Sequence, residues 1–152
     1  MTKKTNITLI GMAGVGKTTL GKRIAKYFKL KFIDIDDEIE NSEERSINEI
    51  IAQDSEDYFI QVEEKVTLNL DLTLPSVLST GGSIIYTQKA MEFLKEKSTV
   101  VFLQSSPSQI KHRLHNLNTR GIIGLKDKSF EELYYERLPL YKKYADLTFR
   151  TS

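Results

Sequence analysis

Residues 11–18 read GMAGVGKT, and this segment matches the pattern G-x-x-x-x-G-K-[ST] at every fixed position. The apolar run at residues 7–10 predicts a short strand just before the segment. Apolar residues at helical spacing predict a helix just after it: Leu20, Ile24, Ala25 and Phe28. A strand, a glycine-rich turn and a helix in this order indicate a phosphate-binding loop (P-loop). The alternative interpretation is an ordinary glycine-rich turn, and the flanking pattern disfavours it.

The residue types of this loop suit a nucleotide. Glycines let the backbone wrap tightly, so that several N–H groups point at one phosphate group. The start of the helix near Lys17 adds its positive end at the same point. We expect Lys17 to reach the β- and γ-phosphates and the Thr18 hydroxyl to bind Mg²⁺. The predicted nucleotide contacts in the loop are Gly11, Gly14, Val15, Gly16, Lys17, Thr18 and Thr19.

Length and composition narrow the class of protein. A chain of 152 residues is expected to form one domain with a sizeable core. It has no cysteine, which excludes disulfides and a thiolate zinc site and suits a reducing compartment. The 22 basic and 21 acidic side chains give a net charge of +1, without the basic excess that a nucleic-acid-binding surface needs. No stretch fits a signal peptide or a membrane span. We therefore expect a cytoplasmic monomer with no nucleic-acid or membrane partner.

Predicted strands and helices alternate along the chain, which indicates a parallel sheet with helices on both faces. Strands are expected at residues 7–10, 31–36, 76–79, 99–103 and 147–149. Helix starts are indicated at 37, at Thr87 and at three capping boxes, 46–49, 106–109 and 129–132. Pro139 is expected to kink or end the last helix. The predicted fold is a single α/β domain, residues 1–152. It has three layers, a doubly wound five-stranded parallel sheet and a ligand site at the carboxyl ends of the strands.

Two aspartates lie at the end of the second predicted strand. Residues two apart in a strand point to one face, so the carboxylates of Asp34 and Asp36 are expected to face the same cleft. Phosphoryl transfer needs one acidic group near Mg²⁺ and another that orients or deprotonates the acceptor hydroxyl. The alternative is a pair of solvated carboxylates at a strand–helix junction, with Asp36 or Asp37 as a helix N-cap. The P-loop one strand away favours the functional interpretation.

Glycines and arginines add further candidates. Gly81 and Gly82 follow a predicted buried strand, where they favour close approach of a ligand to the backbone over a plain turn. Arg120 lies in a polar loop, residues 118–128, that suits a lid closing over the γ-phosphate. The alternative is a solvated loop arginine. The rigid fork of Arg137 suits a carboxylate or phosphate, although a lone helical arginine is more often a surface residue.

One amphipathic helix carries three further polar candidates. Arg113 lies either near the nucleotide or on a solvated face of that helix. His112 and His115 are three residues apart with no third ligand in sight, so we interpret both as surface residues rather than metal ligands. Four tyrosines beyond this helix are expected to pack helices rather than to bind bases: Tyr134, Tyr135, Tyr141 and Tyr144.

The order of these motifs resembles that of the shikimate kinase family. The family has a P-loop, then a strand with two aspartates, here within FIDIDDEIE at residues 32–40. A Ser-Ile-x-Glu-Ile helix follows, here at 46–50, and then Thr80-Gly81-Gly82. The lid arginine matches Arg120, and an Arg-x-Pro-x-Tyr segment lies at 137–141. The resemblance covers nearly the whole chain and implies a P-loop fold of the nucleoside-monophosphate-kinase kind.

The resemblance implies ATP-dependent phosphorylation of the 3-hydroxyl of shikimate, in aromatic amino acid biosynthesis, with Mg²⁺ as a cofactor. On the nucleotide side, Lys17 would hold the phosphates, Thr18 would bind Mg²⁺, and Asp34 would support Mg²⁺. Arg120 would close over the transferring phosphate, and Arg113 would lie near the nucleotide.

The acceptor side follows from the same resemblance. Asp36 would bind the acceptor hydroxyls and act as base, so the expected catalytic residues are Lys17, Asp36 and Arg120. Gly81 and Gly82 would offer backbone contacts to shikimate, and Arg137 would pair with its carboxylate. A substrate-binding helical segment would span residues 37–72, and the lid would span 118–128.

The chain departs from the family pattern mainly on the acceptor side. Ile60 stands where the family has a second carboxylate-binding arginine, and Glu63, one helical turn away, would have paired with that arginine. Losing such a charge-assisted contact typically costs a few kcal/mol, on the order of tens- to thousands-fold in affinity. Ser83 replaces the third glycine of the family's triplet, and Gly121 replaces a lid proline. The family continues into a terminal helix and an adenine-packing loop, which we expect to be missing or curtailed because the sequence ends at Ser152.

Three functions stay open at this point. The first is a shikimate kinase with a reshaped acid pocket, and the second is a related kinase for another small hydroxylated metabolite. The third is a nucleotide-binding paralogue without catalysis, which the retained P-loop and acidic residues disfavour. A GTPase is disfavoured because the sequence has no Asn-Lys-x-Asp segment for reading guanine.

Overall fold

The computed structural model describes residues 4–115 and 122–151. Within these residues, five parallel strands form one sheet in the order β2-β3-β1-β4-β5. The strands are β1 (Asn6–Ile10), β2 (Lys31–Asp34), β3 (Ser76–Ser79), β4 (Ser98–Gln104) and β5 (Leu147–Arg150). The predicted five-stranded parallel sheet is thereby confirmed.

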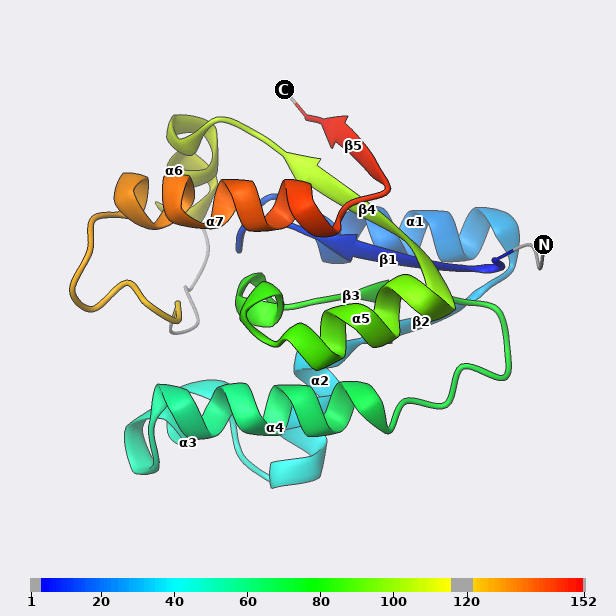
Figure 1. The fold of residues 1–152 in the computed structure, drawn as a ribbon, viewed down its shortest axis with the longest axis horizontal. Coiled ribbons are helices and arrows are strands. Elements are labelled where there is room, and N and C mark those ends of the chain that lie inside the picture. The colour runs from blue at the N-terminus through cyan, green and yellow to red at the C-terminus, as the bar shows by residue number, and fades with distance from the viewer. Residues whose placement is uncertain (1–3, 116–121, 152) are drawn as a thin grey trace.

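Helices connect the strands in the alternating order expected from the sequence (Figure 1). They are α1 (Lys17–Phe28), α2 (Ile35–Glu43), α3 (Ile47–Gln53), α4 (Glu56–Leu68), α5 (Gln88–Lys97), α6 (Pro107–His115) and α7 (Phe130–Tyr144). A 3₁₀ helix, η1 (Gly82–Tyr86), which the sequence did not predict, follows β3. Ser46 and Glu49 form the predicted capping box at the start of α3.

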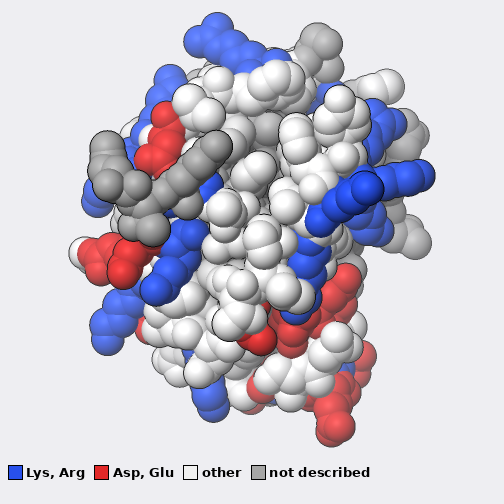
Figure 2. Space-filling view, turned by 90° about the vertical axis from the view of Figure 1, so that its right-hand side faces the viewer, with Lys and Arg blue, Asp and Glu red and all other residues white. Residues whose placement is uncertain are grey.

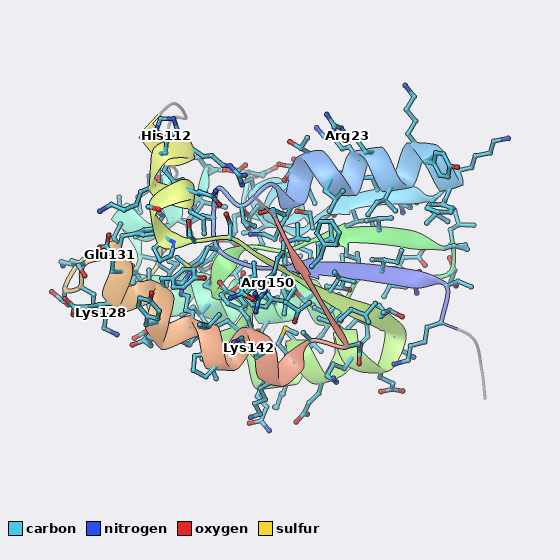
Figure 3. The ribbon with its side chains drawn as sticks, turned by 90° about the horizontal axis from the view of Figure 1, so that it is seen from above. Arg23, His112, Lys128, Glu131, Lys142 and Arg150 are labelled. Carbon is cyan, nitrogen blue, oxygen red and sulfur yellow. The ribbon has the colours of Figure 1, made fainter. Side chains whose placement is uncertain are left out.

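The sheet lies between α1 on one face and α5 and α7 on the other (Figure 3). Successive residues of β1 point to opposite faces. Leu9 packs with Ala25 of α1 and Val77 of β3, whereas Ile10 belongs to the larger core that contains Met91 of α5 and Tyr141 of α7. Both faces of the central strand β1 are therefore buried, and the predicted three-layer architecture is confirmed.

Helices α2, α3 and α4 pack against one another and form a smaller core beside the sheet, at the bottom of Figure 1. Its buried residues are Ile35, Ile39, Ile47, Ile50, Phe59, Val62 and Ile123. This core holds α4 at a fixed position against η1 and α2. Its last member, Ile123, comes from the segment predicted as the lid, so this part of the lid segment packs on the helical unit.

One local prediction was wrong, and two others hold only in part. Strand β2 ends at Asp34 rather than at 36, because the Asp34 carboxylate accepts hydrogen bonds from the backbone N–H groups of Asp36 and Asp37 and so caps α2. Pro139 was expected to kink or end the last helix, and it does not end α7, which continues to Tyr144. Thr87 lies at the N-cap of α5, but its hydroxyl donates to the Ile84 carbonyl instead of capping the helix.

Charge is spread over the surface. Figure 2 shows one face, on which lysines and arginines are interspersed with acidic side chains that gather at the lower right. This distribution agrees with the net charge of +1. None of the helices in residues 4–115 and 122–151 is long and apolar enough to cross a membrane.

Candidate functional site

A cavity of about 530 Å³ opens at the carboxyl ends of β1, β2 and β3. Each strand contributes the segment that directly follows it. The P-loop comes from β1, Asp34 and Asp36 come from the β2–α2 junction, and residues 79–83 follow β3. Arg137 of α7 completes the wall. Residues that lie far apart in the sequence thus line one cavity where a parallel sheet is expected to bind its ligand.

The P-loop forms the tight turn that the sequence predicts. Gly16 precedes α1 with a φ of 108°, a backbone conformation that residues with a side chain rarely adopt. The helix that begins at Lys17 therefore points its N-terminus, with its unpaired N–H groups, into the cavity. This arrangement suits a phosphate group.

Lys17 is a buried cation in the cavity wall. Its ammonium group donates to the carbonyls of Gly11 at 2.6 Å and Met12 at 2.8 Å. Burial lowers the pKa of Lys17 to about 8, and the neighbouring charge of Asp36 partly opposes this shift. At neutral pH the ammonium group therefore stays protonated and can bind an anion.

The predicted Mg²⁺ ligands lie together beside the P-loop. The Thr18 hydroxyl donates to Oδ2 of Asp34 at 3.3 Å and lies 3.4 Å from the hydroxyl of Ser79. Hydroxyl and carboxylate oxygens are hard donors of the kind that Mg²⁺ prefers, with water and phosphate oxygens as its other ligands. The described residues include no cluster of three His, Cys, Asp or Glu side chains that could hold a metal. The donor set thus fits a cation shared with a nucleotide.

The turn after β3 brings the predicted acceptor residues together. A Cβ atom built on Gly81 would lie 2.8 Å from Oδ1 of Asp36 and 3.1 Å from Oε2 of Glu63. A Cβ atom on Gly82 would lie 2.9 Å from Nη1 of Arg137. Both glycines thus leave no room for a side chain, and the backbone runs between a carboxylate and a guanidinium.

Arg137 is almost fully buried, with 1% of its surface exposed, although it lines the cavity. Its guanidinium donates to the carbonyl of Ile123 and lies over the ring of Tyr86, 5.3 Å from the ring centre. No carboxylate among the described residues forms an ion pair with Arg137. A buried guanidinium of this kind can therefore bind a carboxylate from a ligand.

We expect Gly81→Ala to weaken acceptor binding, because the added methyl group would push the Asp36 carboxylate out of place. Displacement of the Asp36 carboxylate should lower kcat/KM for the acceptor by about tenfold to a hundredfold. Steady-state kinetics with the acceptor varied would measure the loss. Ser42→Ala, at an exposed position of α2 that does not line the cavity, is the control. An unchanged kcat/KM in Gly81→Ala would contradict the tight packing.

The remaining candidates lie as follows. Arg113 of α6 donates to the Val15 carbonyl at 3.0 Å, which places it against the P-loop. His112 is exposed on α6 at the edge of the molecule (Figure 3). Arg120 and the side chain of His115 lie outside the described residues. In the described part of the predicted lid, Ile122 and Ile123 line the cavity.

The four tyrosines divide into two groups. Tyr134, Tyr141 and Tyr144 are buried, as the packing prediction required, whereas Tyr135 is 61% exposed. Tyr141 stacks on Phe102 and donates to the Gly82 carbonyl at 2.7 Å. It therefore also holds the glycine turn in place.

Sequence reasoning missed several residues around the cavity. Glu63 and Ser83 were noted only as departures from a pattern, yet both are buried beside Gly81 and Gly82. Glu63 lies on the inward face of α4 between Val62 and Thr67, where a carboxylate is uncommon, and this position was the available signal. Tyr86 contacts Arg137 from a 3₁₀ helix that no local pattern announced.

Comparisons with known proteins agree on one family. The family model described as shikimate kinase matches residues 13–152. The shikimate kinase of Dictyoglomus turgidum is 34% identical over 148 residues, which span 95% of this chain and 86% of that protein. That of Francisella tularensis subsp. novicida is 36% identical over 155 residues, which span 100% of this chain and 88% of that protein.

Solved structures give the same result. The shikimate kinase from Acinetobacter baumannii, solved in complex with shikimate, superposes with a TM-score of 0.86 at 32% identity, over 97% of this chain and 83% of that one. The shikimate kinase from Aquifex aeolicus superposes with a TM-score of 0.81 at 29% identity, over 95% of this chain and 86% of that one.

Proposed function

Because this chain belongs to the shikimate kinase family, we propose that it transfers the γ-phosphoryl group of ATP to the 3-hydroxyl of shikimate. One observation carries the proposal beyond family membership. The cavity joins a phosphate-binding lysine, an acceptor-side carboxylate and a buried arginine that no described carboxylate neutralises. These are the groups that a kinase for a hydroxylated carboxylic acid requires.

On the nucleotide side, Lys17 and the P-loop N–H groups bind the phosphates, and Arg113 lies near the nucleotide. Thr18 and Asp34 hold Mg²⁺, which, when bound, neutralises charge on the phosphate oxygens. Arg120 in the lid at 118–128 is proposed to cover the transferring phosphate. These groups position the phosphoryl group and exclude water from it.

On the acceptor side, Arg137 pairs with the shikimate carboxylate, and Gly81 and Gly82 contact the ring through their backbone. Asp36 then lies near the acceptor hydroxyl, orients it and accepts its proton as the phosphoryl group transfers. The helical segment 37–72 carries the acceptor pocket. The described lining of the cavity comes from one chain, which suits a monomer, and the use of ATP suits the cytoplasm.

ADP release from MgATP, measured with and without shikimate, tests the proposal. High shikimate concentrations are needed because Ile60 replaces an arginine on the acceptor side. Strong dependence of ADP release on shikimate supports the activity. ATP binding without any such dependence would overturn it.

Ile60 also supports a second candidate, a kinase of the same kind for a less acidic hydroxylated metabolite. Ile60 is half-buried and packs in the apolar core of α2, α3 and α4, so it offers no charge to an anionic acceptor. A thermal-shift screen of polyols and sugar acids, with shikimate included, separates the two candidates. Greater stabilisation by a neutral polyol than by shikimate would favour the second.

Asp36→Asn should lower kcat by about a hundredfold, because the amide cannot accept the proton of the acceptor hydroxyl. Rapid-quench or coupled kinetics at saturating MgATP and shikimate would measure the effect. Glu38→Gln, an exposed position on the same helix, removes the same charge and serves as the control. A loss confined to KM would show that Asp36 binds the acceptor without accepting a proton.

A further inference from the structure

Glu63 is a carboxylate buried behind the acceptor side of the cavity. It is 0% exposed and does not line the cavity, yet its Oε2 would lie 3.1 Å from a Cβ atom on Gly81. Oε1 accepts a hydrogen bond from the Ser83 hydroxyl at 3.0 Å. Oε2 has no hydrogen-bond partner among the described residues. A carboxylate in this state is expensive to keep ionised.

The two departures from the family pattern on the acceptor side, Ile60 and Ser83, both change the surroundings of Glu63. Ile60 lies one turn before Glu63 on α4 and offers an apolar side chain, so it supplies no cation. Ser83, which lies on the turn after β3, supplies a neutral hydroxyl instead. Glu63 therefore has a partner that can hydrogen-bond either the neutral or the ionised form.

Several charged or titratable groups face Glu63 from the elements around it. Asp36 comes from α2, and Arg137 and Tyr141 come from α7. Glu49 of α3 and Glu92 of α5 are exposed. Arg137 is a cation whose charge acts on Glu63 and favours its ionised form.

This inference rests on the proposed function. We propose that Glu63 is a positioning residue that remains a neutral carboxylic acid and thereby leaves the charge of Arg137 to the carboxylate of the acceptor. Arg137 and Glu63 flank neighbouring glycines of the same turn, so their charges interact across it. An ionised Glu63 would neutralise part of the attraction that Arg137 exerts on an anionic acceptor.

The environment of Glu63 favours the neutral form. The pKa of Glu63 is raised to about 8. Burial is the main cause and the charge of Asp36 adds to it, while Ser83 and Arg137 act in the opposite direction. Glu63 is therefore neutral at pH 7 and ionises as the pH rises through about 8. By linkage, binding of an anionic acceptor makes Glu63 hold its proton more tightly. Ionisation of Glu63 in turn weakens binding of the acceptor.

The test is the KM for shikimate from about pH 6.5 to about pH 9.5 at saturating MgATP, which keeps Lys17 occupied by phosphate. In the wild type we expect the KM to rise by about tenfold across this range. Glu63→Gln, which cannot ionise, should hold the rise below about twofold. Ser83→Ala removes the bond that stabilises the ionised form and should move the rise to higher pH.

Glu64→Gln removes a carboxylate from the next position of α4 and is the matched control. It should reproduce the wild-type pH profile. An equal rise of KM in Glu63→Gln and the wild type would overturn the proposal. A failure of the proposed function would look different, because the wild type would then show no shikimate-dependent turnover at pH 7.

Thermal unfolding gives a second readout that needs no acceptor. The pKa of Glu63 is higher in the folded protein than its ordinary value of 4.5. Keeping the group neutral therefore costs stability progressively as the pH rises from that ordinary value to about 8. The melting temperature of Glu63→Gln, relative to that of the wild type, should therefore rise as the pH increases over this range. A constant difference would contradict a neutral Glu63.

Discussion

Lys17→Met is expected to lower kcat by on the order of 10³-fold or more, the largest loss from any single change in this protein. Lys17 is the buried cation at the start of α1, and methionine keeps the length of its side chain without the charge. Without that charge, nothing else in the P-loop supplies a cation to the β- and γ-phosphates at this point. Single-turnover measurements with saturating MgATP would separate the chemical step from nucleotide binding.

Two comparisons make the Lys17 result interpretable. Lys26→Met, on an exposed position of the same helix, should leave kcat within about twofold of the wild type. The melting temperature of Lys17→Met should change little, because removing a buried charge offsets the loss of its hydrogen bonds to the Gly11 and Met12 carbonyls. A Lys17→Met protein that folds normally and keeps more than about a tenth of the wild-type kcat would contradict the assigned role.

Arg137→Gln is expected to raise the KM for shikimate by on the order of a hundredfold to a thousandfold, while the KM for ATP changes little. Arg137 is the buried guanidinium between Tyr86 and the Ile123 carbonyl. A neutral amide cannot replace its charge-assisted bonds to a carboxylate. The position of Ile60 makes this loss larger, since no second arginine shares the carboxylate. Kinetics with each substrate varied in turn would show the separation.

Arg113→Gln is the matched comparison for Arg137→Gln. It removes an arginine that contacts the Val15 carbonyl of the P-loop, so its effect should fall on the KM for ATP. Arg137→Gln should thus raise mainly the KM for shikimate, and Arg113→Gln mainly the KM for ATP. If Arg137→Gln raised both KM values equally, Arg137 would be a structural residue of the cavity wall rather than the acceptor's partner.

The sheet and the P-loop could be predicted because their signals are local. Apolar runs mark the strands, and the P-loop pattern lies between β1 and α1. The β2–α2 junction was predicted two residues too late. The alternation of residues 31–36 resembles a strand, but the carboxylate of Asp34 satisfies two backbone N–H groups and starts a helix instead. Asp36 still reaches the cavity, from the first turn of α2.

Pro139 shows the limit of a single-residue rule. A proline removes one backbone donor and disfavours a helix interior. Helix α7 nevertheless runs through it, with Leu133, Tyr134, Arg137, Tyr141 and Tyr144 buried along one side. The burial of this face outweighs the local cost. The prediction that Arg137 suits a carboxylate did not depend on that helix end.

The acceptor side was harder to predict because it depends on contacts between distant segments. Three separate segments meet there: α4 carries Glu63, the turn after β3 carries Ser83, and α2 carries Asp36. No local sequence pattern links these residues. Arg120 lies outside the described residues, so its place in the lid stays a prediction. Kinetic measurements on variants therefore test the roles of the residues on the acceptor side.

The most direct measurement is the identity and amount of the product. Purified protein is incubated with MgATP and shikimate, and ADP and phosphorylated shikimate are quantified in the same sample by mass spectrometry and ³¹P NMR. Our account predicts equal amounts of the two, with the phosphate on the 3-hydroxyl. ADP formed without phosphorylated shikimate, or a phosphate on another hydroxyl, would contradict it.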